Sequence, residues 1–446
     1  MKIQLPDKVR TLIAVLEEHG YAAYAVGGCV RDRLLGREPQ DWDLCTAATP
    51  EEMEHCFAGF HVEETGLQHG TLTVVLDHEP FEITTFRIDG TYRDHRRPDA
   101  VTFTDSLTED LRRRDFTINA MACSDRTGLV DPFGGQRDLA AGTVRCVDDP
   151  ARRFSEDALR ILRCVRFAAV LDFAIEEKTA AEMLEQCDSL QLIAAERQRV
   201  ELVKLLCGRA AAAVMRQYRE VIAAVVPEMR PAFDCDQQND FHIYDVWEHI
   251  LHTVDAIPAQ PLLRLAAFFH DIGKPACKTV TDEGWGHFYR HERVGAKITD
   301  AVMRRLHFDN RTRETVVELV ARHGIVFRSG GKQPHRLLVR LGEEQLRRLI
   351  ELERADVRSQ APQCVDERLR NIDAFTADVE RVIREENCFS LRDLAVDGND
   401  IIAVGVPRGP QVGRVLRRLL DDVIEGKVNN DKVSLLRAVK NYHSIF

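Results

Sequence analysis

The stretch that decides the fold is "AVGGCVRDRLLGREPQDWDL", residues 25–44. A short apolar run ends in the adjacent glycines Gly27 and Gly28, and the helix-type sequence VRDRLLG follows. Because glycine has no Cβ, backbone N–H groups at such a helix start can approach a phosphate. Asp41 and Asp43 then alternate, and strand spacing directs both carboxylates to the same face. Two such carboxylates repel each other unless a cation lies between them, and hard oxygen ligands favour Mg²⁺.

A glycine pair or an Asp-x-Asp motif by itself is usually part of a solvated loop. Here both occur together with Arg31 between them, which indicates a site for a metal-bound phosphate.

A second cluster, "LRRRDFTINAMA", covers residues 111–122. Its arginine run leads directly into an apolar segment, so we expect at least one arginine to enter a pocket. A guanidinium there would offset part of the negative charge of a triphosphate and donate two hydrogen bonds to its oxygens.

A third cluster, "SEDALRILRCVRFAA", covers residues 155–169 and is predicted to be one helix. At 100° per residue its apolar side chains share one sector, and Glu156, Arg160 and Arg163 lie opposite. Asp157 lies one step round from Arg160, and Arg166 lies at the polar edge. The simplest alternative is an exposed helix with a Glu156–Arg160 pair that contributes a few tenths of a kcal/mol.

Length and patterning predict several domains. The chain has 446 residues, which is enough for two to four domains. The first ~145 residues alternate helical and strand-type runs, and the rest is helical almost to the end. We therefore predict an α+β fold, with a head that has a mixed or antiparallel β-sheet and helices, followed by a helical neck, body and tail. The predicted domains are residues 1–146, 147–230, 231–365 and 366–446.

Composition excludes some classes of protein. The net charge of −11 argues against a protein that coats nucleic acid through its overall charge, so any such contact must be local. Residues 401–446 form a more basic end, with eight Lys/Arg against four Asp/Glu. The twelve cysteines form no CxxC pair and are expected to be reduced. Without a long apolar run or the apolar core of a signal peptide, the protein is expected to be soluble and cytoplasmic.

The motifs GGxVRD, DxD, RRDFTINAM and EDxxRxLRxxRFA, in this order, resemble those of the class II tRNA nucleotidyltransferases, the CCA-adding enzymes, and their bacterial poly(A) polymerase relatives. The stretches "FRIDGTYRDHRRPDAVTF", "DPFGGQRDL" and "AAERQRVELVKLL" are also similar to that family. The resemblance is close over residues 20 to 210 and looser over most of the rest. It implies template-independent addition of CCA to the 3′ end of tRNA, with CTP and ATP as the nucleotide donors.

The resemblance also implies residue roles. Asp41 and Asp43 would be the catalytic residues that hold Mg²⁺. The nucleotide-binding residues would be Gly27, Gly28, Arg31 and Arg114 at the triphosphate and ribose, and Asp157, Arg160, Arg163 and Arg166 in the neck. Metal ions would align the RNA 3′-hydroxyl with the α-phosphate, and pyrophosphate would leave in line.

The Asp157/Arg160 pair offers a way to select bases without a nucleic-acid template. Cytosine and adenine both present an exocyclic amino donor beside a ring-nitrogen acceptor, which suit a carboxylate and a guanidinium. Uracil and guanine present a carbonyl and a ring N–H there. An unpaired buried polar group costs roughly 1–3 kcal/mol, so the discrimination is large.

A fourth constellation belongs to a different chemistry. His249, His270, Asp271 and Asp356 match the HD phosphohydrolase pattern, with His291 and His323 in the positions of its additional histidines. Imidazoles and carboxylates suit a divalent transition metal, which can activate water against a phosphoester. Related enzymes can also retain such a domain as structure, so both interpretations stay open.

The leading hypothesis is a CCA-adding nucleotidyltransferase with a phosphohydrolase activity in the HD region. A poly(A) polymerase, or an enzyme that adds only CC or only A, is the alternative within the class. A metal phosphohydrolase with an RNA-binding head is the alternative from another class, and the intact Asp-x-Asp motif argues against it. In the C-terminal region, Arg414, Arg417 and Arg418 either clamp RNA phosphates or belong to a capped surface helix.

Overall fold

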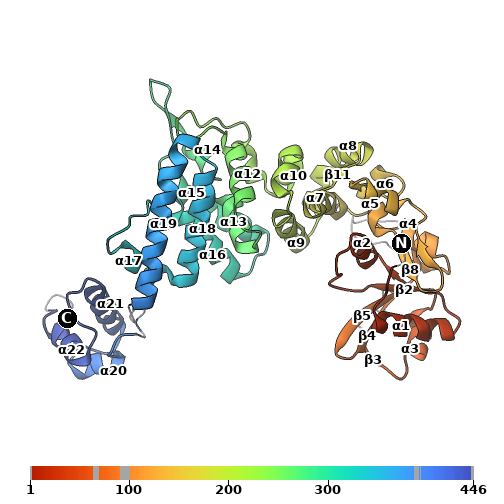
Figure 1. Ribbon diagram of the computed structural model, residues 1–446, viewed down its shortest axis with the longest axis horizontal. Helices are drawn as coiled ribbons and strands as arrows, with labels where there is room; N and C mark the ends of the chain where they lie inside the picture. Colours follow the sequence, from red (N-terminus) through yellow and green to blue (C-terminus); the bar gives the residue numbers. More distant parts are fainter. Residues whose placement is uncertain (1–2, 64–69, 91–100, 386–390, 392, 443–446) are drawn as a thin grey trace. The chain divides into compact units, whose positions relative to one another are not determined.

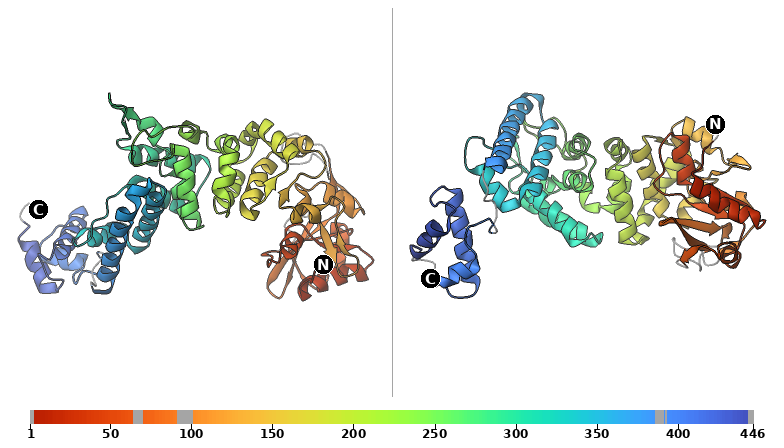
Figure 2. Two further views of the ribbon diagram at one scale, coloured as in Figure 1. Left: turned by 45° about the horizontal axis from the view of Figure 1, so that its top comes forward. Right: turned by 60° about the horizontal axis from the view of Figure 1, so that its bottom comes forward.

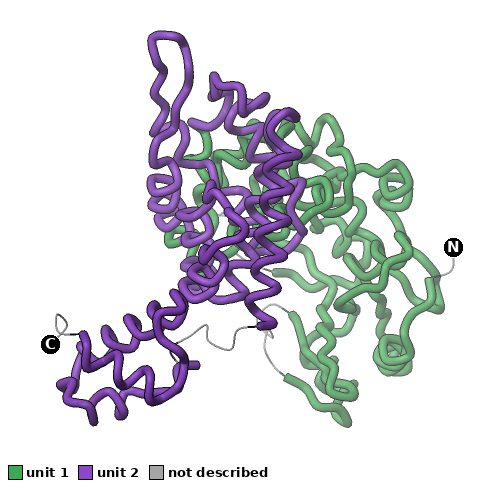
Figure 3. Tube along the Cα trace, turned by 60° about the vertical axis from the view of Figure 1, so that its left-hand side comes forward, with its two compact units in different colours: residues 1–230, 304–308 green, residues 231–303, 309–446 purple. Residues whose placement is uncertain are grey.

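The computed structural model describes residues 3–63, 70–90, 101–385, 391 and 393–442. The chain forms two compact units (Figure 3). Unit 1 comprises residues 1–230 and 304–308, and unit 2 comprises residues 231–303 and 309–446. The family-like stretch at residues 86–103 lies partly outside the described residues.

A seven-stranded mixed sheet forms the head in unit 1, as predicted. Its order is β3-β4-β5-β2-β1-β8-β9, in which β2 and β5 are parallel and the other neighbours antiparallel. The strands of this sheet are β1 (Ala23–Val26), β2 (Leu44–Thr46), β3 (His61–Glu63), β4 (Thr71–Leu76), β5 (Glu79–Thr85), β8 (Ala122–Ser124) and β9 (Gly128–Val130). β6 (Arg87–Asp89) and β7 (Val101–Phe103) form a separate antiparallel pair.

The first helix of the head shows how the apolar pattern sets the packing. Val9, Leu12, Ile13 and Leu16 recur at helical spacing and are all buried, and the helix ends before Gly20, whose φ is +92°. This helix, α1, packs on β1, while α3 packs on β4, and the two helices contact each other (Figures 1 and 2). The head helices are α1 (Asp7–Glu18), α2 (Gly28–Leu34), α3 (Pro50–Cys56), α4 (Leu107–Arg112), α5 (Gly135–Ala140) and the 3₁₀ turn η2 (Thr117–Asn119).

The rest of unit 1 is a helical neck. The prediction of one helix over residues 155–169 is wrong, because the chain bends at Asp157 (φ −138°, ψ 102°) between two helices. The predicted apolar sector is confirmed: its side chains are buried, at Ala158, Ile161, Leu162, Val165, Ala168 and Ala169. The neck elements are α6 (Pro150–Glu156), α7 (Leu159–Leu171), α8 (Glu177–Glu185), η3 (Cys187–Leu192), α9 (Ala195–Leu206), α10 (Ala211–Gln217), α11 (Arg219–Val225), η4 (Pro227–Ala232) and the parallel pair β10 (Thr143–Val144) and β11 (Ala174–Ile175).

The described part of unit 2 is helical apart from a short antiparallel hairpin, β12 (Thr279–Val280) and β13 (Gly286–His287). Helices α12, α13, α16 and α18 pack against one another and carry most of the second candidate site. The helices are α12 (Val246–Ala256), α13 (Pro261–Phe269), α14 (Lys274–Cys277), α15 (His291–Arg305), α16 (Asn310–Arg322), α17 (Gln333–Leu341), α18 (Glu343–Arg358), α19 (Pro362–Glu385), α20 (Gly398–Ala403), α21 (Pro410–Ile424) and α22 (Lys432–Lys440).

The last three helices share an apolar cluster of their own that includes Ile401, Val415 and Leu435. The division into four domains stays a prediction. The two units divide between Arg230 and Pro231, and α19 runs through the expected boundary at residues 365/366. Among the described residues, no helix is long and apolar enough to span a bilayer.

Candidate functional site

The glycine turn of the head holds an arginine in place. Gly27 follows β1 with φ +83°, and its amide donates to the Met121 carbonyl at 3.1 Å. A Cβ on Gly27 would lie 2.9 Å from Nη1 of Arg114, so another residue at this positive φ would strain the turn and displace the guanidinium. Burial opposes the charge of Arg114, but the carboxylates of Asp110 and Asp43 outweigh it and raise its pKa.

The two aspartates lie on one solvent-facing side, as their spacing predicts. Asp41 and Asp43 are exposed and alternate with buried Trp42 and Leu44. They precede β2 rather than belonging to it, and the Asp43 carbonyl accepts from the Val26 amide at 3.0 Å. This contact fixes the pair beside the end of β1.

A third carboxylate, Glu82, lies near this pair. β5 pairs in parallel with β2, and Glu82 occupies an exposed position of β5 next to buried Ile83. Asp43 is open to solvent on one side, but desolvation by the surrounding protein raises its pKa, Arg114 lowers it, and the charges of Glu82 and Asp41 raise it further. Three carboxylates that repel each other beside one arginine fit a divalent cation bound through oxygen atoms.

A chain of hydrogen bonds connects this site to the neck. Arg31 donates to the side-chain oxygen Oδ1 of Asn119 at 2.7 Å. The side-chain nitrogen Nδ2 of Asn119 in turn donates to Asp115 at 3.1 Å. Asp115 in turn accepts from Nε and Nη2 of Arg163, at 2.8 and 2.6 Å. Burial opposes ionisation of Asp115, but Arg163 and Asn119 hold its pKa far below the ordinary value. Arg31, which is expected at the triphosphate, and Arg163, which is expected in the neck, therefore belong to one hydrogen-bond network.

The Phe167 ring lies beside three guanidinium groups. Those of Arg31, Arg163 and Arg166 lie 5.1, 5.3 and 3.6 Å from its centroid. Arg166 also donates to Glu201 at 2.7 Å. The structure thus brings the arginines of the first and third sequence clusters together around one aromatic side chain.

The two predicted base-reading residues have different partners. Asp157 forms a two-point pair with Arg197, at 2.9 and 3.4 Å, and accepts from the Leu159 amide at 3.1 Å. Arg160 donates to Glu156 at 2.7 Å and to the Arg113 carbonyl at 2.9 Å. Arg160 is 8% exposed, so the simple expectation of an exposed Glu156–Arg160 pair is wrong: the pair exists but is buried where the neck meets the head.

In unit 2, four histidines aim the same ring atom at a common centre. Each uses Nδ1 to contact a backbone carbonyl oxygen 2.6–3.2 Å away, at His249, His270, His291 and His323. Their Nε2 atoms meet in two pairs, His249–His270 at 3.2 Å and His291–His323 at 3.0 Å. If Nδ1 donates in each ring, the Nε2 lone pairs face each other, which is favourable only with a cation between them.

Asp271 joins these two pairs. Its Oδ2 lies 3.3 Å from Nε2 of both His249 and His270, and its Oδ1 lies 3.3 Å from Nε2 of both His291 and His323. The described residues thus contain two groups suited to hold a metal, and they share Asp271. Burial lowers the pKa of His323, which favours the neutral, metal-binding imidazole.

Two further charged groups complete this centre. Asp356 on α18 lies 2.9 Å from Nε2 of His249. Lys274, which is 4% exposed, lies 2.6 Å from Oδ2 of Asp271. Burial opposes ionisation of Asp271, but Lys274 and His270 hold its pKa well below the ordinary value.

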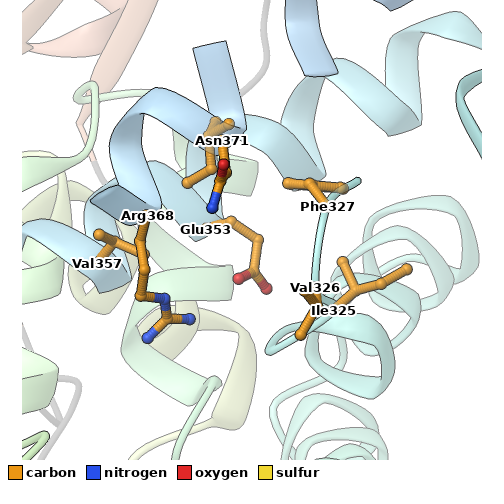
Figure 4. Close-up of a pocket in the computed structure, with 8 residues that line it drawn as sticks. Ile325, Val326, Phe327, Glu353, Val357, Arg368 and Asn371 are labelled. Atoms are coloured by element: carbon orange, nitrogen blue, oxygen red, sulfur yellow. The ribbon is translucent and has the colours of Figure 1, made fainter. Parts of the chain in front are cut away.

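A small pocket next to the centre contains the buried carboxyl of Glu353 (Figure 4). Figure 4 shows the side chain of Glu353 directed toward the segment that contains Ile325 and Val326. It accepts from the Gly324 amide, directly after His323 at the end of α16. Burial and the charge of Asp356 raise the pKa of Glu353 well above the ordinary value. Glu353 thereby fixes the backbone next to a histidine of the centre.

The predicted RNA-binding arginines lie on α21, which begins at Pro410 directly after Gly409. Arg414, Arg417 and Arg418 are exposed, while Val415 and Leu419 on the same helix are buried. Arg418 lies 3.5 Å from Asp422.

Sequence reasoning missed Glu82, Asn119, Arg197 and Lys274. Glu82 has a usable signal, because it lies on a strand whose apolar residues alternate with polar ones. Asn119 lies inside the quoted stretch RRDFTINAM, and Lys274 follows His270 and Asp271 closely, but their partners Arg31 and Gln237 are far away in the sequence. Arg197 lies inside the quoted stretch AAERQRVELVKLL, but nothing in that stretch indicates that it pairs with Asp157.

Paired carboxylates at a strand end, next to an arginine-lined neck, define a nucleotidyltransferase. Residues 23–145 match the family described as "Poly A polymerase head domain", residues 172–232 match "Probable RNA and SrmB- binding site of polymerase A", and residues 241–360 match "HD domain". The CCA-adding enzyme of Levilactobacillus brevis is 35% identical over 436 residues and 97% of each chain. That of Leuconostoc mesenteroides is 32% identical over 99% of each chain. The chain belongs to the family of CCA-adding enzymes.

Solved structures agree with this assignment. The crystal structure of the Bacillus stearothermophilus CCA-adding enzyme in complex with CTP has a TM-score of 0.68, with 27% identity over 98% of each chain. The Thermotoga maritima CCA-adding enzyme complexed with tRNA shares the fold, with a TM-score of 0.56 at 20% identity.

Proposed function

We propose that this chain adds C, C and A to the 3′ end of tRNA from CTP and ATP, with Asp41 and Asp43 as its catalytic residues. The observation that carries the proposal is the placement of both carboxylates on one exposed side, near Glu82 and Arg114. Two carboxylates with a nearby cationic side chain suit transfer of a nucleotidyl group from a metal-bound triphosphate.

In this reaction one group of residues would hold the metal ion and another would bind the triphosphate. Asp41 and Asp43 would hold Mg²⁺, which stabilises the negative charge that develops on the reacting phosphate. The turn at Gly27 and Gly28, with Arg31 and Arg114, would bind the triphosphate. The RNA 3′-hydroxyl oxygen bonds to the α-phosphorus and loses its proton, while the bond to the β-phosphate oxygen breaks and pyrophosphate leaves.

The neck would select the base. Asp157 would accept from the exocyclic amine of cytosine or adenine, and Arg160 would donate to the ring nitrogen. The contacts of Arg160 with Glu156 and the Arg113 carbonyl hold its guanidinium in a fixed orientation. Arg163 and Arg166 line the same region around Phe167 and connect it to the triphosphate residues.

The test uses tRNA that lacks its last three nucleotides, with Mg²⁺ and each nucleoside triphosphate alone and in combination. Sequencing of the 3′ ends should show addition that stops after CCA when CTP and ATP are both present. Continued addition of A would instead identify a poly(A) polymerase, and a product ending in CC or gaining only A would identify a partial enzyme. Asp125→Asn, at an exposed carboxylate of the head, serves as a control and should retain activity.

A second activity is carried by the histidine centre of unit 2. We propose that His249, His270, Asp271 and Asp356, with His291 and His323, hold divalent transition metal ions and hydrolyse phosphoesters. The convergence of four Nε2 atoms on the two oxygens of Asp271 supports this proposal. A bound metal lowers the pKa of a water molecule and so supplies a nucleophile at neutral pH.

This second proposal is tested by the variant that combines His270→Ala with Asp271→Ala. After loading with Mn²⁺ and desalting, the parental protein should retain about two ions per chain and the variant fewer than one. Hydrolysis of 2′,3′-cyclic phosphates should disappear while CCA addition continues. His252→Ala, on the same helix as His249 but outside the centre, should change neither measurement. Parental hydrolysis by the double variant would contradict the assignment.

The substrate sets two further expectations. Arg414, Arg417 and Arg418 would contact phosphates of tRNA, so replacing all three with Gln should weaken tRNA binding and flatten its dependence on salt. An unchanged salt slope would assign them to a surface helix. Because tRNA is processed where translation takes place, we place the enzyme in the cytoplasm.

A further inference from the structure

The cavity beside the histidine centre has an aromatic lining. Its volume is about 370 Å³, which is in the range of small-molecule sites. Buried Asp271, His323 and Asp356 line it together with aromatic side chains. Of these aromatics, Phe241 is 53% exposed and Tyr289 is 71% exposed. The cavity therefore joins a buried ionic centre to solvent-facing rings.

Most of these rings belong to the β12–β13 hairpin and the residues that follow it. The hairpin lies between α14 and α15 and projects from the helices of unit 2, near the α14 label in Figure 1. The rings of His287 and Tyr289 stack, with centroids 5.1 Å apart and an angle of 15° between their planes. Tyr289 lies only two residues before His291, one of the histidines of the centre.

The hairpin is fixed relative to that centre. The Gly286 amide donates to the Gln238 carbonyl at 2.8 Å, and a Cβ on Gly286 would lie 2.2 Å from the Gln237 carbonyl oxygen. The side chain of Gln237 accepts from Lys274 at 2.8 Å, and Lys274 contacts Asp271. Close backbone packing at Gly286 and this polar chain connect the second strand of the hairpin to the metal-binding side chains.

We propose that Tyr289 and His287, with Phe241, form a subsite that stacks on an unpaired nucleobase while its phosphoester reaches the histidine centre. The substrate class is then a nucleoside phosphoester, such as the terminal nucleotide of a single-stranded RNA end. Base–aromatic stacking tolerates every base because each base has a π-face. Lys274 and Arg368, which also line the cavity, supply positive charge for the phosphate. This substrate class rests on the hydrolysis proposed above.

Two phosphomonoesters of secondary alcohols separate base stacking from phosphate chemistry. Guanosine 2′-monophosphate carries a base that the head is expected to reject, and glycerol 2-phosphate carries none. With Mn²⁺, Tyr289→Ala should raise KM for the guanosine nucleotide roughly 5- to 150-fold, as expected when one stacking partner is removed. Its kcat/KM for glycerol 2-phosphate should stay at the parental value, and Tyr289→Phe should resemble the parent. Equal losses on both substrates, or no loss on either, would overturn the subsite.

Binding provides a readout that does not need turnover. The chain has three tryptophans, and Trp42 and Trp247 are buried whereas Trp285 lines the cavity. Guanosine 2′-monophosphate should quench the fluorescence of the parent, ribose 5-phosphate should not, and Trp285→Phe should remove the response. If neither phosphomonoester is hydrolysed but the quenching follows this pattern, the hydrolysis proposal fails and the subsite stands. Equal quenching by both ligands, or none, would overturn the subsite.

Discussion

Replacing Asp157 with Asn tests how the neck selects a base. In the structure Oδ1 of Asp157 accepts from the Leu159 amide at the start of α7, and the carboxylate pairs with Arg197. Asn retains an oxygen for the Leu159 amide, so helix α7 keeps its first contact. The other atom becomes an amide donor, which opposes the exocyclic amine of cytosine but suits the O4 carbonyl of uracil.

The expected magnitude follows from the hydrogen bond to the base that the substitution removes. One unsatisfied polar group costs roughly 1–3 kcal/mol, so the efficiency of CTP relative to UTP should fall about 5- to 150-fold. The ion pair with Arg197 joins side chains that are 30% and 16% exposed, and its loss should affect all nucleotides equally. Single-turnover kinetics with the four nucleoside triphosphates measures this ratio, and Arg197→Met is the control that removes the ion pair alone. An unchanged ratio of CTP to UTP efficiency in Asp157→Asn would refute the base-reading role.

Three further outcomes follow from the packing of unit 1. Asp115→Ala removes a buried carboxylate that accepts two hydrogen bonds from the partly exposed Arg163, and should destabilise unit 1 by ~1.5–3 kcal/mol in calorimetry; a loss below ~0.5 kcal/mol would contradict the network. Gly208→Ala places a Cβ 2.7 Å from backbone atoms of α7 and should lower the Tm by several degrees, whereas Gly59→Ala, with open space around it, should not. Glu82→Gln should raise the Mg²⁺ concentration for half-maximal addition several-fold, and Glu79→Gln on the same strand should not; equal responses would remove Glu82 from the site.

Local patterns predicted the head and the apolar face of the neck because these depend on residues close in sequence. Val9, Leu12 and Leu16 mark α1, and alternation around Trp42 places both aspartates on one side. The bend at Asp157 was not predictable from helical periodicity. Asp157 ends α6, accepts from the Leu159 amide at the start of α7, and also pairs with Arg197, which lies forty residues further along the chain.

The second candidate site shows the same limit. The sequence pattern named all six side chains, but not the way in which they share Asp271. That arrangement follows from α12, α13, α15, α16 and α18 coming together, and from backbone carbonyls that orient each imidazole. The hairpin segment, residues 279–289, carries a local turn signal at Asp282, Glu283 and Gly284, but its sequence does not indicate that its rings lie beside the histidine centre.

The most direct test of the central claim is addition of CMP to tRNA lacking CCA by Asp41→Asn and Asp43→Asn, measured in a single turnover beside tRNA binding. We expect each variant to lose addition by at least ~100-fold, since removing a metal-holding carboxylate removes several kcal/mol of transition-state stabilisation. Binding of tRNA should stay near the parental affinity. Addition at the parental rate by either variant would contradict the assignment of these two aspartates as the catalytic pair.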